Sequence, residues 1–409
     1  MSRPIPDADF PLLYPKGYPS DKEKSGLPND PKFCLACPVA KPYKGAGDAP
    51  SAQERNAPCP CRSDAPPGPE QDLGSPDRLT YILRRSFIGF IVIHTDPLHS
   101  DFSAEREELS ALGAEFRTAR CRTEEEVAAA CREANGLIVT YAKVGRTALA
   151  AMPHLRIIVR TGVGYDTLDV PAATERKVLV ANVPDYCVSE VADHTLALLL
   201  SWWRRIGELD QQVRAKGWGL PAKPVLRLEG RTLGILGLGR MGRAVALRAR
   251  GFGVRVVACD PYVPQEVFAT LGIQPARLEE LLRASDILTI HAPLTDETRA
   301  IISEKTLRLM QPTAVVVNTS RGGLINTDDL MRAIREGWIA GAALDVIEVE
   351  PLPLDHPIRS LPRVLLTPHA AWYSEDSEPE LRRRAARIVV QALRGERPAS
   401  LLNPEVLDP

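Results

Sequence analysis

Apolar and polar positions along the chain switch between two periods from residue 86 onward, and each switch marks a predicted element. The apolar run 87–95 is rich in β-branched residues, which is typical of a parallel strand buried on both faces. Residues 103–114 follow with apolar positions at helical spacing and Gly113 as a stop. Later switches predict strands at 115–121, 136–141 and 155–161, a helix at 123–134 and a short helix ending at Met152. This alternation predicts a doubly wound α/β domain over 86–185.

A second domain follows a long helical pattern. Residues 189–217 are expected to form one helix that carries the chain into the next domain, with Ser189 as N-cap and acids in its first turn. After it, strand and helix patterns alternate again and predict six strands, which indicates a second α/β domain over 186–370. Residues 377–395 have the pattern of an amphipathic helix with its basic side outward. We expect this helix to pack back on the first domain, so that 371–409 completes it.

The first 85 residues have a different composition. They are rich in Pro, Gly, Ser, Asp and Lys and show almost no apolar periodicity, so we expect a disordered extension. Cys34, Cys37, Cys59 and Cys61 lie here in C-x-x-C and C-x-C pairs. Four clustered cysteines could hold zinc, but the C-x-C pair is poorly spaced for a zinc ribbon and no histidine is near. We therefore expect no metal site.

Charge and hydropathy exclude several classes of protein. The chain has 51 Lys and Arg against 52 Asp and Glu, a net charge of −1, so no basic excess points to direct nucleic-acid binding or an anionic membrane surface. The N-terminus lacks a basic segment leading into an apolar one, so no secretory signal is expected. The longest apolar runs are too short to cross a bilayer. These features predict a soluble, cytoplasmic protein.

Three glycines carry the clearest binding motif. Gly237, Gly239 and Gly242 have G-x-G-x-x-G spacing between a strand and a helix, and Asp260 ends the next strand. In such a turn the first glycine makes the tight bend, the second lets the backbone approach a pyrophosphate, and the third lets helix and strand pack closely. Asp260 would accept hydrogen bonds from ribose hydroxyls and repel a 2′-phosphate. An ordinary turn with an unrelated acid is the less favoured alternative, and the pattern predicts a Rossmann NAD site.

Three charged or titratable residues lie at predicted strand ends in the same domain: Arg321, Glu350 and His369. Ligands of open α/β sheets bind beyond the carboxyl ends of the strands, where these side chains would gather. Each alone could be structural: a surface arginine, a glutamate at a turn or a buried histidine. Their joint occurrence beside the dinucleotide motif favours a catalytic set, in which histidine gives or takes a proton near neutral pH.

Residues of the first domain are expected to line the substrate pocket on the side opposite these three residues. In the stretch RTGVGYD, 160–166, two glycines follow a strand directly, so the backbone N–H groups of Val163 and Gly164 can hold a carboxylate. A simple glycine turn is the alternative. Tyr141, at the end of another strand, is a weaker candidate for the pocket, and Arg160 opens the loop itself.

The motifs GLGRMG with Asp260, NTSRGG, ALDVIEVEP and TPHAAW, in this order, resemble the D-isomer-specific 2-hydroxyacid dehydrogenases. The resemblance covers about 86–405, and PHAAWYSE and RIIVRTGVGYD look most like the C-terminal-binding-protein branch. It implies a Rossmann NAD-binding domain inserted in a flavodoxin-like substrate domain. It also implies that His369 is the acid/base, Glu350 its partner and Arg321 the substrate anchor. Further cofactor contacts implied by the family are Arg240, Met241, Thr195, His291, Pro293, Thr319 and Asp345.

Two functions follow from this resemblance. The first is an NAD-dependent reductase of a small 2-keto acid, with phosphoglycerate dehydrogenase and glyoxylate/hydroxypyruvate reductase as alternatives within that class. The second is an NAD(H)-sensing protein that recruits partners, as animal members of the branch do. An intact catalytic set favours the enzyme. Trp372 could lie over a substrate side chain or pack at the domain boundary, and Trp202 and Trp203 are expected to form the interface of a homodimer.

Overall fold

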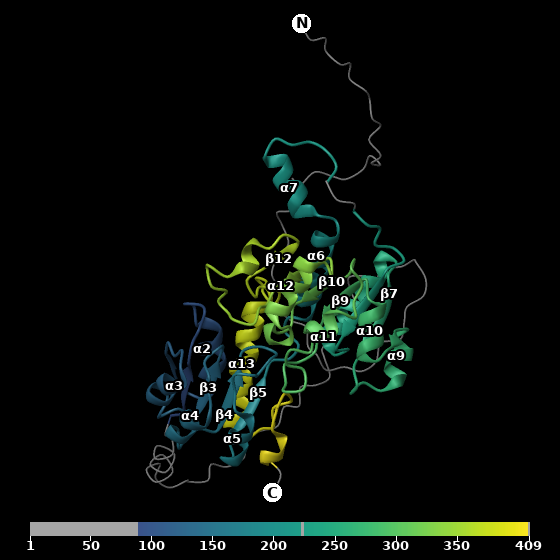
Figure 1. Ribbon diagram of the computed structural model, residues 1–409. Coiled ribbons are helices and arrows are strands. Elements are labelled where there is room, and N and C mark those ends of the chain that lie inside the picture. Colours follow the sequence, from purple (N-terminus) through teal and green to yellow (C-terminus); the bar gives the residue numbers. More distant parts are fainter. Residues whose placement is uncertain (1–88, 222–224, 408–409) are drawn as a thin grey trace, which may run out of the picture. The chain divides into compact units, whose positions relative to one another are not determined.

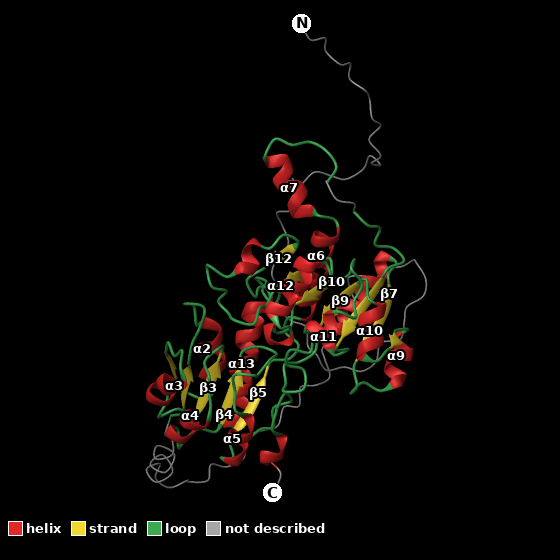
Figure 2. Cartoon of the chain, in the orientation of Figure 1, coloured by secondary structure: helices red, strands yellow, loops and turns green. Residues whose placement is uncertain are grey.

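The structure is a computed structural model that describes residues 89–221 and 225–407. These residues form two parallel sheets, each covered by helices on both faces (Figure 1, Figure 2). The two doubly wound parallel-sheet domains predicted from the sequence are therefore confirmed. The predicted disordered extension 1–85 and its cysteine cluster Cys34, Cys37, Cys59 and Cys61 lie outside the described residues. The predicted limits of the domains stay predictions.

The first sheet has five parallel strands in the order β2-β1-β3-β4-β5. The strands β3, β4 and β5 are buried along their whole length, as expected for strands covered on both faces. The sequence pattern predicts only four of these strands, because the four residues of β5 show no periodicity of their own. The strands are β1 (Ile91–His94), β2 (Glu115–Thr118), β3 (Gly136–Val139), β4 (Ile157–Arg160) and β5 (Leu179–Asn182). The helices between them are α2 (Ser103–Ser110), α3 (Glu124–Ala130), α4 (Arg146–Ala151) and α5 (Val170–Glu175).

The second sheet has seven parallel strands in the order β12-β11-β10-β9-β6-β7-β8, one more than predicted. The additional strand, β8, is only two residues long. Both residues are exposed, and the strand pairs with β7 at the edge of the sheet. The strands are β6 (Thr232–Leu236), β7 (Arg255–Cys259), β8 (Gln274–Pro275), β9 (Ile287–Ile290), β10 (Val315–Asn318), β11 (Gly341–Leu344) and β12 (Val364–Leu366). The helices are α8 (Arg240–Ala249), α9 (Gln265–Leu271), α10 (Leu278–Ala284), α11 (Glu304–Leu307) and α12 (Thr327–Glu336).

Side-chain caps begin several of these short helices, which compensates for their length. Thr123 accepts a hydrogen bond from the Glu126 backbone N–H, and the Glu126 side chain accepts one from Thr123 in return. Asp169 caps α5 and Asn326 caps α12 in a similar way. Each cap satisfies a backbone donor that the helix itself leaves unpaired.

The long helix predicted for 189–217 is two helices, α6 (Val188–Trp203) and α7 (Ile206–Arg214). Arg205 has a left-handed backbone (φ +56°) and interrupts the pattern. The residue before α6 is Cys187, so the prediction of Ser189 as N-cap is wrong, and the Ser189 hydroxyl instead accepts a hydrogen bond from Arg248. In Figure 1, α7 stands away from the strands of the second sheet.

The two tryptophans at the end of α6 do not form an exposed surface. Trp203 is only 4% exposed and donates its indole N–H to the Leu226 carbonyl. Trp202 is half-buried and donates to the Arg363 carbonyl at 2.8 Å. Both rings belong to the core of the second domain, so the expectation that they cover an interface is wrong.

The C-terminal helix α13 (Ser377–Leu393) packs on the first sheet, with Leu381, Ala385 and Val389 in its core. The prediction that its basic side faces outward fails at Arg382, which is buried. Its guanidinium donates from Nε and Nη2 to the two carboxylate oxygens of Glu105 on α2, at 3.0 Å each. Because both partners are buried, this bidentate pair fixes α13 on α2 much more firmly than the exposed pairs beside it.

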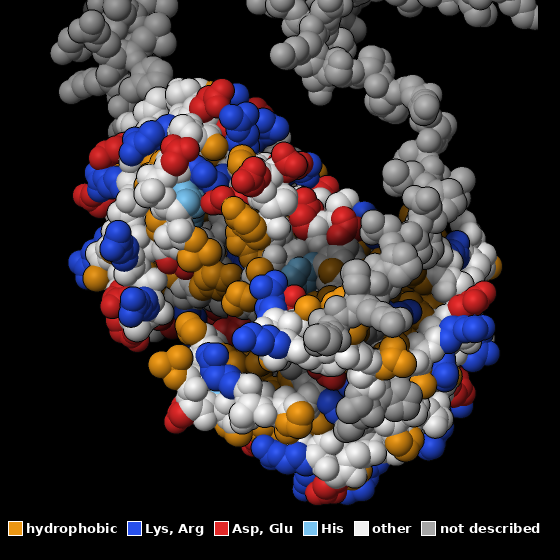
Figure 3. Space-filling model, turned by 90° about the horizontal axis from the view of Figure 1, so that it is seen from above, with side chains coloured by type: hydrophobic (Ala, Val, Ile, Leu, Met, Phe, Trp, Pro, Cys, Tyr) orange, Lys and Arg blue, Asp and Glu red, His pale blue; other side chains and the backbone are white. Residues whose placement is uncertain are grey.

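Charges of both signs intermix over the described part of the face in Figure 3. No helix in residues 89–221 and 225–407 is long and apolar enough to cross a membrane.

We predict that Glu105→Gln lowers the free energy of unfolding by about 3 kcal/mol at pH 7, because it leaves the buried Arg382 charge uncompensated. Burial opposes ionisation of Glu105, but hydrogen bonds from His99 and Arg382 outweigh it and lower its pKa to about 2. A pKa depressed below the ordinary value stabilises the fold above that ordinary value. The wild type should therefore lose this stabilisation as the pH falls from about 4.5 to about 2, and the variant should not.

Urea unfolding at several pH values measures the effect. Glu107→Gln is the matched control, because Glu107 pairs with Arg383 on the exposed side of the same two helices. It should cause no measurable loss. Equal effects of the two substitutions would contradict the assignment.

Candidate active site

One cavity of about 440 Å³ lies between the two sheets. Its lining comes from the loops that follow strands of both sheets, among them the loops after β3, β4 and β5 and those after β6, β9, β10 and β12. The N-terminus of α8 and the start of α13 complete it. The carboxyl ends of the strands thus meet at the cavity, as expected for ligand sites in open α/β sheets.

His369 lines this cavity and is paired with Glu350, which does not line it. His369 Nδ1 lies 2.6 Å from Glu350 Oε2, and the other carboxylate oxygen accepts the Ile347 backbone N–H at 3.0 Å. The carboxylate therefore accepts a hydrogen bond from Nδ1–H and leaves Nε2 for another group. His369 Nε2 has no hydrogen-bond partner among the described residues. The ring lines the cavity, 6.0 Å from the ring of Tyr141 between centroids.

The loop that carries His369 is tied to Asp345. The Asp345 carboxylate accepts hydrogen bonds from the Ala370 and Ala371 backbone N–H groups and from the Thr367 hydroxyl, and its carbonyl accepts the His369 N–H at 2.7 Å. His369 is thereby held in a left-handed conformation (φ +55°), which is uncommon for a residue other than glycine. Burial opposes ionisation of Asp345, but hydrogen bonds from His194, Thr367 and the two backbone groups lower its pKa to about 2.

Arg321 is fixed from both domains. Its Nε donates to Asp166 Oδ1 of the first domain at 3.0 Å, and its Nη1 donates to the Ser320 carbonyl. The guanidinium lies against Gly164, where a Cβ atom would come within 1.8 Å of Nη2. Glycine at this position therefore gives Arg321 its place beside the exposed backbone of the loop 160–166.

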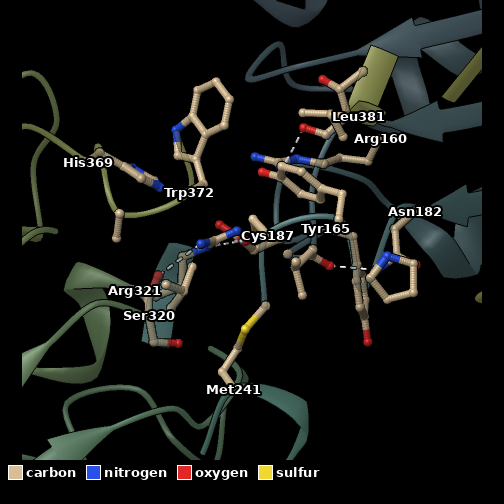
Figure 4. A pocket seen from close by; sticks show the side chains of 18 of the residues that line it. Arg160, Tyr165, Asn182, Cys187, Met241, Ser320, Arg321, His369, Trp372 and Leu381 are labelled. Carbon is tan, nitrogen blue, oxygen red and sulfur yellow. Dashed lines mark hydrogen bonds and ion pairs between the residues drawn. The ribbon is translucent and has the colours of Figure 1, made fainter. Parts of the chain in front are cut away.

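The first domain supplies the facing wall. The backbone N–H groups of Val163 and Gly164 have no partner among the described residues, while the Val163 carbonyl accepts a hydrogen bond from Asn182 at 2.6 Å. Arg160 is buried, donates to the Thr161 carbonyl, and places its guanidinium 5.7 Å from the Tyr141 ring centroid. In Figure 4 the guanidinium of Arg160 points to the middle of the pocket from the side opposite His369.

Trp372 has contacts on both sides, and its two predicted roles stay predictions. It lines the cavity, and its ring also packs near Tyr186 and Tyr373, with centroids 6.3 and 5.7 Å away.

The glycine-rich turn has the geometry that a dinucleotide requires. Gly237 has φ +94°, and a Cβ there would come within 2.6 Å of the Ala292 N, so the tight bend needs glycine. A Cβ on Gly242 would come within 2.2 Å of the Gly237 carbonyl oxygen, so helix and strand pack closely. Open space surrounds the Cβ position of Gly239 at the N-terminus of α8, which leaves room for a phosphate beside the backbone.

Asp260 lies beside this turn. Its two carboxylate oxygens accept the backbone N–H groups of Leu238 and Tyr262, at 2.8 and 3.0 Å, and each can accept one more hydrogen bond. The chain therefore holds the carboxylate where a ribose bound at the turn would reach it.

The remaining predicted cofactor residues separate into two groups. Thr195 is fully buried in α6, where its hydroxyl donates to the Val191 carbonyl and accepts from Thr319, and it does not line the cavity. His291 Nε2 is buried without a partner, and burial lowers the pKa of His291 to about 4, so the ring is neutral and free to bond a ligand. This orphaned polar atom fits a bound nicotinamide dinucleotide. The predicted residues that line the cavity are Arg240, Met241, His291, Pro293, Thr319 and Asp345.

Sequence reasoning missed two residues that organise the site. Asp166 ends the stretch RTGVGYD. An acidic residue directly after the two glycines was the feature of the sequence that could have identified it. Asn182 ends the strand β5, which the pattern did not reveal, so no signal placed it beside Val163.

One group of residues has metal-ligand chemistry within the described part of the chain: His94, His99 and Glu105. Both oxygens of Glu105 already accept hydrogen bonds from Arg382, and one of them also contacts His99 at 2.9 Å. The guanidinium thus takes the place where a cation would bind the carboxylate, and the geometry gives no support to a metal.

Comparison with known proteins agrees with this geometry. Residues 196–371 match the D-isomer specific 2-hydroxyacid dehydrogenase, NAD binding domain. The chain is 43% identical over 261 residues to a glyoxylate reductase of Korarchaeum cryptofilum, covering 63% of this chain and 79% of that protein. It is 37% identical over 314 residues to a D-3-phosphoglycerate dehydrogenase of Methanocaldococcus jannaschii, covering 76% of this chain and 59% of that protein.

A solved structure, a D-lactate dehydrogenase from Aquifex aeolicus in complex with NAD and lactic acid, superposes with a TM-score of 0.69 at 28% identity. The match covers 76% of this chain and 98% of that one. The glycine turn, the cavity at the strand ends and the relatives lead to one conclusion: the chain belongs to the D-isomer-specific 2-hydroxyacid dehydrogenase family and is an NAD-dependent oxidoreductase that acts on CH–OH groups.

Proposed function

We propose that this enzyme interconverts a small 2-keto acid and its D-2-hydroxy acid, with His369 as acid/base, Glu350 as its partner and Arg321 as substrate anchor. The proposal is carried by the 2.6 Å bond between His369 Nδ1 and Glu350 Oε2, since His369 lines the same cavity as Arg321. We further propose that residues 186–370 bind NAD. Residues 86–185, completed by 371–409, then form the substrate domain.

The protein groups divide the chemistry among them. NADH, bound at the glycine turn, supplies the hydride. His369 Nε2 delivers the proton to the developing alkoxide, and Glu350 stabilises the imidazolium before that transfer and keeps Nδ1 protonated after it. Arg321 Nη2 and the N–H groups of Val163 and Gly164 are free to hold the substrate carboxylate and carbonyl. Their fixed positions orient one face of the keto carbon.

His369→Ala is predicted to lower kcat for 2-keto acid reduction by about a thousandfold, because the proton donor is lost. NADH binding, measured by fluorescence titration, should stay unchanged. The control is His154→Ala, since His154 is an exposed histidine outside the cavity. An unchanged kcat in His369→Ala would remove the histidine from the mechanism.

The substrate class depends on which acid group of the substrate Arg160 binds. Burial lowers the pKa of Arg160, and no carboxylate among the described residues forms an ion pair with it. A buried guanidinium without an anionic partner is costly, so an acid group from the substrate would stabilise it. We propose that Arg160 binds the carboxylate that all 2-keto acids share. The glyoxylate reductase names of several relatives support glyoxylate as the substrate.

Arg160→Met is predicted to raise KM about tenfold for glyoxylate, hydroxypyruvate and pyruvate alike, with a smaller change in kcat, because a charge-assisted bond to the shared carboxylate is lost. NADH-oxidation assays on these acids and on phosphohydroxypyruvate measure it. A loss confined to phosphohydroxypyruvate would assign Arg160 to a second acidic group and favour phosphoglycerate dehydrogenase activity.

The second predicted function, an NAD(H)-sensing protein of the C-terminal-binding-protein type, stays an alternative without a structural observation in its favour. NADH binding without turnover on any of these acids would favour it. A cytoplasmic location likewise remains part of the proposal.

We also propose a homodimer, formed by the segment 206–220 instead of Trp202 and Trp203. Ile206 and Val213 on α7 are about half exposed, and Trp218 and Leu220 beyond it are 91% and 93% exposed. Apolar side chains gathered on one protruding segment are typical of an interface.

Light scattering should give twice the chain mass for the wild type and the chain mass for the double variant Trp218→Ser, Leu220→Ser. His154→Ala should stay dimeric. A monomeric wild type would rule out the homodimer.

A further inference from the structure

Helix α6 presents polar side chains to the loops that carry His369 and Arg321, two of the three proposed catalytic residues. Glu190 and His194 lie four residues apart and therefore on one face of the helix. Glu190 Oε1 accepts a hydrogen bond from the Ser374 hydroxyl at 2.9 Å, and His194 Nε2 lies 3.0 Å from the Thr367 hydroxyl. These two contacts hold the segment 367–374 near its two ends, with His369 between them. Neither Glu190 nor His194 lines the cavity.

The contact of His194 continues to Asp345. Thr367 donates its only hydroxyl proton to the Asp345 carboxylate at 2.5 Å, because a carboxylate can only accept. The Thr367 oxygen must then accept from His194, so His194 carries a proton on Nε2. The same nitrogen lies 3.5 Å from Asp345 Oδ1. His194 thus fixes Thr367 and, through it, one of the two oxygens of Asp345.

Asp345 transmits this constraint to His369. Its carboxylate holds Ala370 and Ala371, and its carbonyl holds the backbone N–H of His369. These bonds surround a left-handed residue, a conformation that persists only where neighbouring structure enforces it. Loss of the His194 hydrogen bond to Thr367 should therefore let the His369 ring move relative to Glu350 and the substrate.

The helix is well placed for this role. α6 begins at Val188, a few residues after β5 of the first sheet ends at Asn182, and it packs against α8 of the second. Thr195, next to His194, also contacts Thr319 at 2.8 Å, two residues before Arg321. One helix thus contacts the loop of His369 and the loop of Arg321.

We propose that Glu190 and His194 are positioning residues that set the catalytic loop 367–374, His194 through Thr367 and Asp345 and Glu190 through Ser374. This inference rests on the proposed function of His369. Neither side chain lines the cavity, so each acts on kcat through the placement of His369.

The test compares His194→Phe, which keeps a planar ring but removes both nitrogens, with His194→Gln, whose amide can still donate to Thr367. His194→Phe should lower kcat about tenfold and leave KM and binding of NADH unchanged, because misplacement of a proton donor costs rate and not affinity. The solvent deuterium isotope effect on kcat should rise. His194→Gln should recover most of the rate.

Thr367→Val removes the same link from its other side while preserving shape. It should lower kcat to a similar extent, and the double variant His194→Phe, Thr367→Val should be no slower than either single variant, since coupled residues are not additive. Glu190→Gln should lower kcat by a smaller factor. Asp193→Asn is the control on the same helix, because Asp193 pairs with Arg248 on the side of α8.

Wild-type kcat and isotope effect in both His194→Phe and Thr367→Val would overturn the proposal, as would fully additive losses in the double variant. Failure of the proposed function is a separate outcome, in which the wild type itself has no turnover or His369→Ala remains active. If His194→Phe does not fold, as judged by NADH binding and thermal unfolding, Thr367→Val and Glu190→Gln decide.

Discussion

The Asp345 carboxylate is the constraint on which the geometry of the active site depends. It is buried and accepts hydrogen bonds from Thr367, Ala370 and Ala371 of one loop, while His194 Nε2 on α6 lies 3.5 Å from its Oδ1. A buried carboxylate with this many donors stays ionised and rigid. Because the donors come from both sides of His369, the carboxylate fixes the one backbone conformation in which the imidazole meets Glu350. The family role of Asp345 as a cofactor contact would be added to this structural one.

Close approach of backbone and guanidinium groups is the second constraint. Gly162 and Gly164 have no side chains, and the guanidinium groups of Arg160 and Arg321 fill the space beside these two residues of the loop after β4. Arg160 belongs to the first domain and Arg321 to the second. Asp166 neutralises Arg321 and leaves Arg160 without an acid. The pocket thus contains a positive charge that no carboxylate among the described residues pairs with.

The sequence was informative where local chemistry decides the structure. Short apolar runs located the buried strands, and the spacing of Gly237, Gly239 and Gly242 located the turn, because a side chain at Gly237 or Gly242 would clash with the backbone. Strand-end positions brought Arg321 and His369 to one cavity. Tertiary contacts decided the rest. Arg205 interrupts a pattern that is helical on both sides, and β5 and β8 are strands only because a neighbour pairs with them.

Side-chain burial was the least predictable feature, since one face of a helix can meet either solvent or a partner that is distant in sequence. The sequence pattern predicted that Arg382 is exposed like the other arginines of α13, but Arg382 is buried against Glu105 of α2. Thr195 appeared suited to contact a cofactor, yet its hydroxyl is directed to Thr319. In both cases the missing information was which side of the helix packs against another element. The same uncertainty hid His194 and Glu190, whose face of α6 meets the catalytic loop. Polar residues on an otherwise apolar helix therefore identify positioning contacts only once the packing is known.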